Sequence, residues 1–554
     1  MKQAYNWSKL VGEPDSRFRY YIKPQRIVWF DQGDGKLENI DRLLLNDNTY
    51  CLMKSGNAKG PAFVLDFGAE LNGGVCIELA DCYHIETAER VRQVCFRLRF
   101  GESVSEVMGQ PDNDHASHDM VLTIPFLSKQ EFGLTGFRFL RIDMLEQNTC
   151  APIRSIKAVA LERPLEYKGC FESSDALLNQ IWQIGARTVH LCCQDYLLDG
   201  IKRDRMEWAG DIDPQACVIA NVFGDIDIVP KTLELLRNRT GHHLWMNNLC
   251  SYSLWWIITV WRWYWYTGDK HFLYRQVEYI ENLIEWLPEH VDSNGREKLT
   301  GERLIDWSTV GDEPVISQGH EAMLVWAIES AKSIFDEVEN PRMNDTIVKV
   351  LARLKSASIE STVNKQVNAL RVLAGITSAT EANMASLSLC PNEGLSPWFG
   401  FYILEARAKA CDYQGCLDVI LKYWGGMVKL GATTFWEHFD EAWLHNAGRI
   451  DEITPAGKHD VHAEYGYNCF KGLRHSLCHG WACGPTAWLS QNILGIQPAA
   501  PGFKKVTISP NLGNLAFAKG AVPTPFGLIT VSHKRQADGK VATEYDVPKD
   551  IQVI

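Results

Sequence analysis

The chain changes its hydrophobic periodicity twice, and this change constrains its fold more than any other feature. In residues 1–165, apolar and polar side chains alternate with a period of two, in segments bounded by Gly, Asn and Asp. Residues 166–496 show helical spacing instead, and the alternation returns in residues 497–554. A chain of 554 residues with this pattern predicts a multidomain α+β protein, with a helical domain between two β-rich regions.

Strand patterns at both ends of the chain indicate β-sandwich regions. In the first region the alternating segments are Phe63–Phe67, Gly74–Leu79, Val94–Phe100 and Gly136–Ile142. In the last region they are Lys505–Ser509, Leu528–Ser532 and Val541–Tyr545, with a hairpin turn at Ala537–Gly539. Because some 55 residues form only a marginal core alone, we expect the C-terminal region to pack on the helical part.

The middle of the chain predicts about a dozen amphipathic helices. Ser174 is expected to cap a first helix that begins at Asp175. Further helical segments are Leu254–Tyr266, Phe272–Leu287, His320–Val338, Asn344–Ser356, Trp398–Cys411 and Gly415–Leu430. Their number suits a closed barrel of helical hairpins, although periodicity alone does not distinguish a barrel from a solenoid.

Composition excludes several classes of function. The net charge of −12, without a long basic run, argues against nucleic-acid binding. The longest strongly apolar stretch, Leu254–Tyr266, is too short to span a bilayer and contains Arg262, and the N-terminal residues lack an apolar signal segment. Sixteen Cys without a C-x-x-C pair favour reduced thiols over a disulfide scaffold or zinc ribbon. We therefore expect a cytoplasmic protein without membrane partners.

Tryptophan is concentrated in the helical part of the chain. Of the 19 Trp residues, 17 lie between Trp182 and Trp488. Indoles are flat and largely apolar, so they can cover the apolar face of a sugar ring. Acidic residues beside such indoles would be candidates for acid and base chemistry on that sugar.

The segment Asp199–Asp211 combines carboxylates, arginines and an indole. Asp204 lies between the two terminal aspartates, beside Arg203 and close to Trp208. In a cleft, neighbouring carboxylates raise one another's pKa, which keeps one of them protonated as a general acid. A solvated helix end with incidental ion pairs explains the same residues equally well.

Two further segments repeat the pairing of polar and aromatic side chains. Glu437 directly follows Trp436, and His479 and Trp481 open a helix that ends near Gly495. A structural Glu at a helix end and a structural His donor are the alternative interpretations. Two carboxylate and Trp clusters, more than 200 positions apart, together favour a carbohydrate site, because glycosidic cleavage uses a pair of carboxylates.

These motifs resemble the bacterial α-L-rhamnosidases of glycoside hydrolase family 78. The resemblance rests on segments 199–211, 431–437, 476–481 and 501–515, and extends to 66–73, 101–105 and 136–141. It implies an (α/α)6-barrel catalytic domain flanked by β-sandwich domains. It also implies hydrolysis of terminal α-L-rhamnosyl groups from small rhamnosides or oligosaccharides, with inversion, without a cofactor, in a homodimer.

The resemblance also implies roles for individual residues. Asp204, where many members have Glu, corresponds to the general acid, and Glu437 to the general base. Inversion would then place these carboxylates about 6.5 to 9.5 Å apart. Glu207 stands where the family has a small or apolar residue, and no role is assigned to it. The expected substrate-binding residues are Asp199, Arg203, Trp208, Asp211, Asp306, Trp307, Trp436, His479 and Trp481, with Trp398 near them.

Other patterns carry less weight. Asp112–Asp119 and His459–Glu464 resemble metal clusters but lack a recognised ligand spacing, so we read them as polar loops and expect no metal site. Thr259–Tyr266, with three Trp, fits barrel core better than a second sugar platform.

Two other functions remain open alternatives. One is another helical-barrel glycoside hydrolase, acting on a different terminal sugar or as an uronyl hydrolase. The other is a non-catalytic carbohydrate-binding protein, which would need the Trp and Arg residues but not both carboxylates. The presence of Asp204 together with Glu437 favours catalysis.

Overall fold

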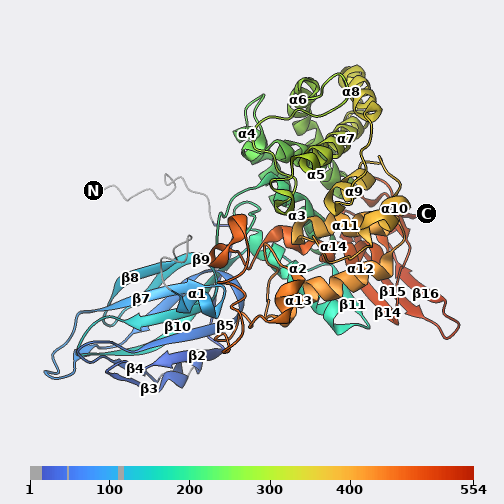
Figure 1. The fold of residues 1–554 in the computed structure, drawn as a ribbon. Coiled ribbons are helices and arrows are strands. Elements are labelled where there is room, and N and C mark those ends of the chain that lie inside the picture. Colours follow the sequence, from blue (N-terminus) through green and yellow to red (C-terminus); the bar gives the residue numbers. More distant parts are fainter. Residues whose placement is uncertain (1–14, 46–48, 110–117) are drawn as a thin grey trace, which may run out of the picture.

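The computed structural model describes residues 15–45, 49–109 and 118–554. A β-rich region (blue in Figure 1) lies beside the helical part, and the C-terminal strands (red) lie on another side of it. The two changes of periodicity in the sequence therefore correspond to changes of architecture.

The N-terminal region is a ten-stranded sheet in which the described strand pairs are all antiparallel. Seven of the strands follow one another in the order β3-β4-β10-β5-β9-β7-β8. Of the other three, β1 and β6 pair with β10, and β2 pairs with β5. Apolar side chains from these strands form one buried core. The strands are β1 (Phe18–Ile22), β2 (Arg26–Asp31), β3 (Lys36–Glu38), β4 (Cys51–Lys54), β5 (Ala62–Leu79), β6 (Tyr83–His84), β7 (Gln93–Gly101), β8 (Asp119–Pro125), β9 (Lys129–Met144) and β10 (Thr149–Glu162), with helix α1 (Val104–Met108) after β7.

Strand β5 joins two segments that the sequence analysis treated as separate strands. The residues between them, which suggested a turn, form bulges instead: the register against β9 shifts between Asp66 and Leu71 and again after Gly73. Gly68 and Gly73 have φ of 91° and 153°, which their missing side chains permit. A bulge bends a strand without ending its hydrogen bonding, so one long strand results.

The helical part contains thirteen α-helices among the described residues, and each predicted segment coincides with helix in the structure. The helix predicted at His320–Val338 begins seven residues earlier, at Glu313, and the segment Gly415–Leu430 holds two α-helices joined by a π-helical turn. The first helix begins one residue later than expected, because Asp175 caps it and accepts hydrogen bonds from the amides of Leu177 and Leu178. Ser174 instead accepts one from Ala516. The helices are α2 (Ala176–Cys192), α3 (Ala209–Val222), α4 (Ile228–Arg239), α5 (Cys250–Thr267), α6 (Lys270–Trp286), α7 (Glu313–Glu337), α8 (Asn344–Ser356), α9 (Lys365–Leu373), α10 (Ala379–Ala382), α11 (Pro397–Lys409), α12 (Tyr413–Val419), α13 (Gly425–Lys429) and α14 (Gly484–Trp488).

Alternate helices form a closed inner ring. Around this ring α3 packs on α5, α5 on α7, α7 on α9, α9 on α11, α11 on α14, and α14 again on α3. All residues of α3 and α14 are buried, as expected for helices surrounded by other helices. The outer helices α6 and α8 are amphipathic and keep one exposed face. Ring closure confirms the (α/α)6 barrel and excludes a solenoid.

The C-terminal strands form two small sheets. One has the order β11-β14-β15-β16 and the other β12-β13-β17. Strand β11 precedes the first barrel helix, so the start of the helical part contributes to the C-terminal sheet. His533 of β15 bonds the carbonyl of Leu494 at 3.0 Å, which joins this sheet to the barrel. The strands are β11 (Cys170–Ser173), β12 (Ile496–Pro498), β13 (Lys505–Ile508), β14 (Phe517–Thr524), β15 (Gly527–Arg535), β16 (Val541–Asp546) and β17 (Gln552–Val553).

Candidate active site

The residues singled out from the sequence gather at one end of the barrel, where the inner helices begin. Asp211 lies in the first turn of α3, and Trp398 in the first turn of α11. Asp306 and Trp307 precede α7, and His479 and Trp481 precede α14. Because consecutive inner helices run in the same direction, loops far apart in the sequence meet at this end.

The loop before α3 has a sharply turned backbone. Asp204 and Arg205 both have φ of 54°, in the left-handed region that non-glycine residues seldom adopt. Asp199 stabilises this turn, because its carboxylate accepts the amide of Met206 at 2.9 Å and its own amide donates to the Met206 carbonyl at 3.0 Å. The turn presents Asp204 at the surface, with 32% of its side chain exposed. Such backbone strain is often found at functional sites.

Arg203 connects the two carboxylates that the sequence analysis assigned as acid and base. Its Nη1 lies 3.3 Å from an Asp204 carboxylate oxygen, and its Nη2 donates to Glu437. Its Nε donates to the carbonyl of Arg474, so the guanidinium plane is held from three sides. One planar group thereby sets the relative position of Asp204 and Glu437.

Glu437 is buried but remains ionised. Burial acts to raise its pKa, but the charges of His479 and Arg203, with hydrogen bonds from Arg203 and the Ser476 amide, outweigh burial and lower the pKa. The Ser476 bond is 3.1 Å long. The Glu437 carbonyl also accepts the indole N–H of Trp481 at 2.9 Å. An ionised carboxylate held in this way is able to accept a proton.

His479 supplies a second positive charge in the site. Its Nε2 bonds an Asp211 oxygen at 3.1 Å. Burial alone would lower the pKa of His479, but the nearby charges of Glu437 and Asp211 raise it to about 9. Burial raises the pKa of both Asp199 and Asp211, against the opposing charge of His479. Asp199, Asp211 and His479 therefore form one buried cluster whose protonation states influence one another.

Aromatic rings surround these charges. Trp481 stacks on Trp398 with centroids 5.0 Å apart and planes 5° from parallel. Trp208 meets the edge of Tyr252 at 6.0 Å, and Tyr252 meets Trp398 at 6.2 Å. A cavity of about 10 Å³ lies beside Glu437, with room for about one water. Its lining residues are Asp306, Trp307, Ser308, Ser396, Trp398, Glu437, His438, Tyr467, Phe470 and Trp481.

Some of the expected substrate-binding residues line this cavity, namely Asp306, Trp307, Trp398 and Trp481, whereas Asp199, Arg203, Trp208, Asp211, Trp436 and His479 are not part of its lining. The indole of Trp436 is buried at 1% exposure and packs on Phe439 and His475. Residues i and i+1 point in different directions here, so Glu437 faces the site while its neighbour faces the core.

Five lining residues were missed by the sequence analysis: Ser308, Ser396, His438, Tyr467 and Phe470. The rings of His438 and Phe470 stack 4.5 Å apart. Adjacency to Glu437 was a signal for His438. Tyr467 and Phe470 lie in a loop without periodicity, so no local pattern marked them. Gln366 was also missed; it donates to Asp306 at 3.1 Å and fixes that carboxylate.

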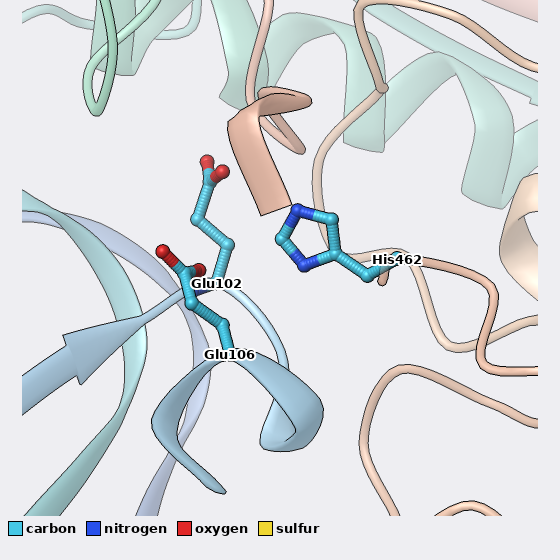
Figure 2. Close-up of side chains that lie close together, drawn as sticks. All are labelled: Glu102, Glu106 and His462. Atoms are coloured by element: carbon cyan, nitrogen blue, oxygen red, sulfur yellow. Dashed lines mark hydrogen bonds between the residues drawn. The ribbon is translucent and has the colours of Figure 1, made fainter. Parts of the chain in front are cut away.

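Glu102, Glu106 and His462 form a compact group beside the site, with ligand atoms all within 4.8 Å of one another (Figure 2). Lys202 pairs with Glu106, lies 3.8 Å from Glu102 and donates to the Leu473 carbonyl. Both ring nitrogens of His462 have hydrogen-bond partners, Ser103 Oγ at 2.6 Å and the His475 carbonyl at 2.9 Å. The lysine ammonium supplies the positive charge of this group, which makes it a buried ion-pair network.

Two other sequence-based expectations concern metals and membranes. Most of Asp112–Asp119 lies outside the described residues. In the second discounted segment, His459 and Glu464 form an exposed pair at 2.7 Å, while His462 points into the network above. Among the residues that the structure describes, no helix combines the length and apolar character needed to cross a bilayer.

Comparison with known families agrees with this geometry. Residues 166–331 match the family model described as the bacterial alpha-L-rhamnosidase 6 hairpin glycosidase domain, and residues 495–553 match the bacterial alpha-L-rhamnosidase C-terminal domain. The resemblance drawn from the motifs is therefore confirmed. A curated alpha-L-rhamnosidase of Alteromonas sp. (strain LOR) is 24% identical over 530 residues, which are 86% of this chain and 54% of that relative.

Solved rhamnosidase structures share the fold. The glycoside hydrolase family 78 rhamnosidase of Bacillus sp. GL1 superimposes with a TM-score of 0.77 at 23% identity, over 92% of this chain and 55% of that one. A rhamnosidase from Klebsiella oxytoca with rhamnose bound has a TM-score of 0.68 at 19% identity, over 86% and 96% of the two chains. This chain thus spans about half the length of the Alteromonas and Bacillus relatives.

Proposed function

We propose that this protein is an α-L-rhamnosidase that removes terminal α-L-rhamnosyl groups from small rhamnosides or oligosaccharides with inversion. The observation that carries the proposal is the pair Asp204 and Glu437, held by one guanidinium at the open end of a rhamnosidase-type barrel. The names of the relatives support the sugar, since they are rhamnosidases and one binds rhamnose.

The two carboxylates differ in the way that inverting hydrolysis requires. Asp204 lies at the exposed rim, where a leaving group departs into solvent, and it would protonate the glycosidic oxygen. Glu437 lies deeper and ionised, and it would deprotonate the water that attacks from the opposite face of the sugar. The bond from O to the anomeric carbon breaks, the water oxygen forms the new bond, and the proton passes to Glu437.

Several buried groups support binding of the sugar. Asp199, Asp211 and Asp306 are placed to accept hydrogen bonds from hydroxyl groups, and Arg203 and His479 to donate them. Trp307, Trp398 and Trp481 offer apolar surface for ring carbons and the C6 methyl group. A different terminal sugar, or binding without catalysis, remains the alternative that experiment must separate.

A panel of aryl glycosides tests the proposal. We expect release of the aryl group from α-L-rhamnosides, and NMR of the first product should show β-L-rhamnose. Release only from other glycosides would assign a different sugar, and α-L-rhamnose as the first product would establish retention. Sugar binding without any release would favour the non-catalytic alternative.

Single substitutions separate the two roles. Glu437→Gln should abolish turnover on all rhamnosides, because no base remains. Asp204→Asn should slow substrates with poor leaving groups far more than those with good ones, which need less protonation. Glu207→Gln is the matched control, since Glu207 lies in the same loop but pairs with Arg239 at 3.2 Å. Equal losses with both leaving groups would contradict Asp204 as the acid.

We further infer a reducing compartment, such as the cytoplasm, and a homodimer. All sixteen cysteines are free thiols in the structure, which supports the first inference. Thiol titration of protein extracted under non-reducing conditions and light-scattering mass measurement test the two inferences.

A further inference from the structure

A second cavity, of about 560 Å³, lies at the opposite end of the barrel. Most of its lining residues come from the C-terminal ends of the inner helices α5 and α11, together with residues of α7 and β12. From Tyr252, near the catalytic residues, to Trp261 the helix α5 advances nine residues, or about 13 Å. From Trp398 to Glu405, α11 advances about 10 Å. The cavity is therefore separate from Asp204 and Glu437, and its volume is typical of small-molecule sites.

Three indoles line this cavity. Trp261 and Trp265 lie one helical turn apart on α5, with ring centroids 5.6 Å apart, and Trp326 comes from α7. All three are only partly buried, unlike Trp255, Trp256 and Trp263 in the same part of the barrel. The indole N–H of Trp265 donates to the Pro498 carbonyl at 3.3 Å, which fixes its orientation. Core packing explains the three buried rings, but it does not explain the exposed faces of Trp261, Trp265 and Trp326.

Polar groups of balanced charge stand between the indoles. Arg262 makes two bonds of 3.2 Å to Glu405, and its Nε lies 3.4 Å from the buried Asp213. Lys409 adds a second positive charge to the lining, in which Glu405 is the one carboxylate. Asp213 lies outside the lining, buried behind Arg262, and brings the local count to two cations and two carboxylates. Asn492 and Gln497 contribute amide groups. A site without net charge, with flat apolar faces and planar polar groups, suits neutral sugars and disfavours an anionic ligand.

We propose that this cavity, lined by Trp261, Trp265, Trp326, Arg262 and Glu405, binds a neutral mono- or disaccharide at the end of the barrel opposite the catalytic residues. The indoles cover the C–H faces of the sugar, and Arg262 and Glu405 form hydrogen bonds with its hydroxyl groups. The sequence analysis preferred barrel core for Thr259–Tyr266. The structure divides that segment, with Trp263 in the core and Trp261 and Trp265 facing the cavity.

Hydrogen exchange of the full chain, read by mass spectrometry, tests the proposal. The probes are L-rhamnose, D-glucose, D-galactose and sucrose, with D-glucuronate as the anionic comparison. We expect at least one neutral sugar to slow exchange in peptides covering residues 258–266 and 491–498, with its own saturation midpoint. Trp261→Ala should raise that midpoint about tenfold or more. Glu405→Gln, which keeps the shape but removes one charge, should also raise it.

Controls distinguish this site from the catalytic one. Tyr274→Ala removes an exposed aromatic ring of α6 outside the lining and should leave the midpoint unchanged. Trp261→Ala should keep its kcat/KM within about twofold on any glycoside that the wild type hydrolyses. If no glycoside is hydrolysed, the exchange measurement still decides this proposal, so its failure is separable from that of the proposed function.

Four results would overturn the proposal. They are no protection in these peptides by any neutral sugar, stronger protection by D-glucuronate, an unchanged midpoint in a folded Trp261→Ala variant, and a dimer mass that Trp261→Ala reduces to that of the monomer. The last result would make the cavity an interface between two copies of the chain.

Discussion

Arg203 determines the geometry of the candidate active site through one planar side chain. Two of its nitrogens reach Asp204 and Glu437, and the third reaches the Arg474 carbonyl. A guanidinium offers several N–H groups in fixed directions, whereas an ammonium is a point charge that cannot reproduce this fork. The positions of both carboxylates therefore depend on Arg203 being arginine.

Arg203→Lys should consequently reduce kcat by about a hundredfold, the loss expected from a misplacement of roughly 1 Å. Steady-state kinetics on an aryl α-L-rhamnoside measure the effect. Arg205→Lys is the control, because the Arg205 guanidinium donates to the Leu134 carbonyl, outside the catalytic pair. A loss of less than about threefold in Arg203→Lys would show that the bridge is dispensable.

His479 should make stability depend on pH. Its pKa rises from the ordinary 6.5 to about 9 in the folded protein, because Glu437 and Asp211 outweigh burial. The folded state then binds this proton more tightly than the unfolded state does. The stabilisation is complete below about pH 6.5 and is lost as the pH rises through 9.

The expected loss for His479 over that range is roughly 3 kcal/mol. Urea unfolding of the wild type and His479→Gln at about pH 6 and pH 9.5 measures it. The wild type should lose more unfolding free energy than the variant between the two pH values. Parallel pH dependence in the two proteins would contradict the assignment of a protonated His479.

At the scale of elements, local signals placed the helices well but their ends less well. A Ser-Asp pair offered two capping residues, and the sequence does not decide between them because both side chains accept a backbone N–H. In the structure Asp175 caps the helix, and Ser174 accepts a hydrogen bond from the amide of Ala516 in the C-terminal segment. The same limit applies to β5, where glycines that suggest a turn form bulges.

Substitution of the cap tests this assignment. Asp175→Ala should lower the free energy of unfolding by about 1 kcal/mol, because the amides of Leu177 and Leu178 lose their acceptor. Asp175→Asn should be nearly neutral, since Asn caps helices as well as Asp does. Chemical denaturation measures both changes, and equal destabilisation by the two would argue for a role of the charge instead.

At the scale of the whole molecule, the N-terminal sheet supports the catalytic loops directly. Glu102 accepts the amide of Leu477 at 2.8 Å, and Glu106 pairs with Lys202, the residue before Arg203. Gly136 of β9 donates to the Ile201 carbonyl at 2.8 Å. The candidate active site thus depends on two domains.

Lys202→Met should leave Glu102 and Glu106 buried without their cation, at a cost of about 3 to 5 kcal/mol in the free energy of unfolding. The double variant Lys202→Met with Glu106→Gln should recover part of this loss, because a neutral amide needs no counter-charge. Denaturation of the two variants gives the coupling between them. Additive losses would mean that the ion pair contributes nothing, and stabilisation of the wild type by added divalent metal would contradict the assignment of an ion-pair network.

The sequence by itself determined the order of β-rich and helical regions, the spans of most helices and the motifs that carry the chemistry. These features depend on residue periodicity and on a few neighbouring side chains, so a linear pattern expresses them. Ring closure depends on packing between α14 and α3, about 270 residues apart, and only the tertiary structure decided for a barrel over a solenoid. It likewise decided that Glu437 faces the site while Trp436 faces the core, and that Arg203 joins two distant carboxylates, because these contacts join residues that no local spacing connects.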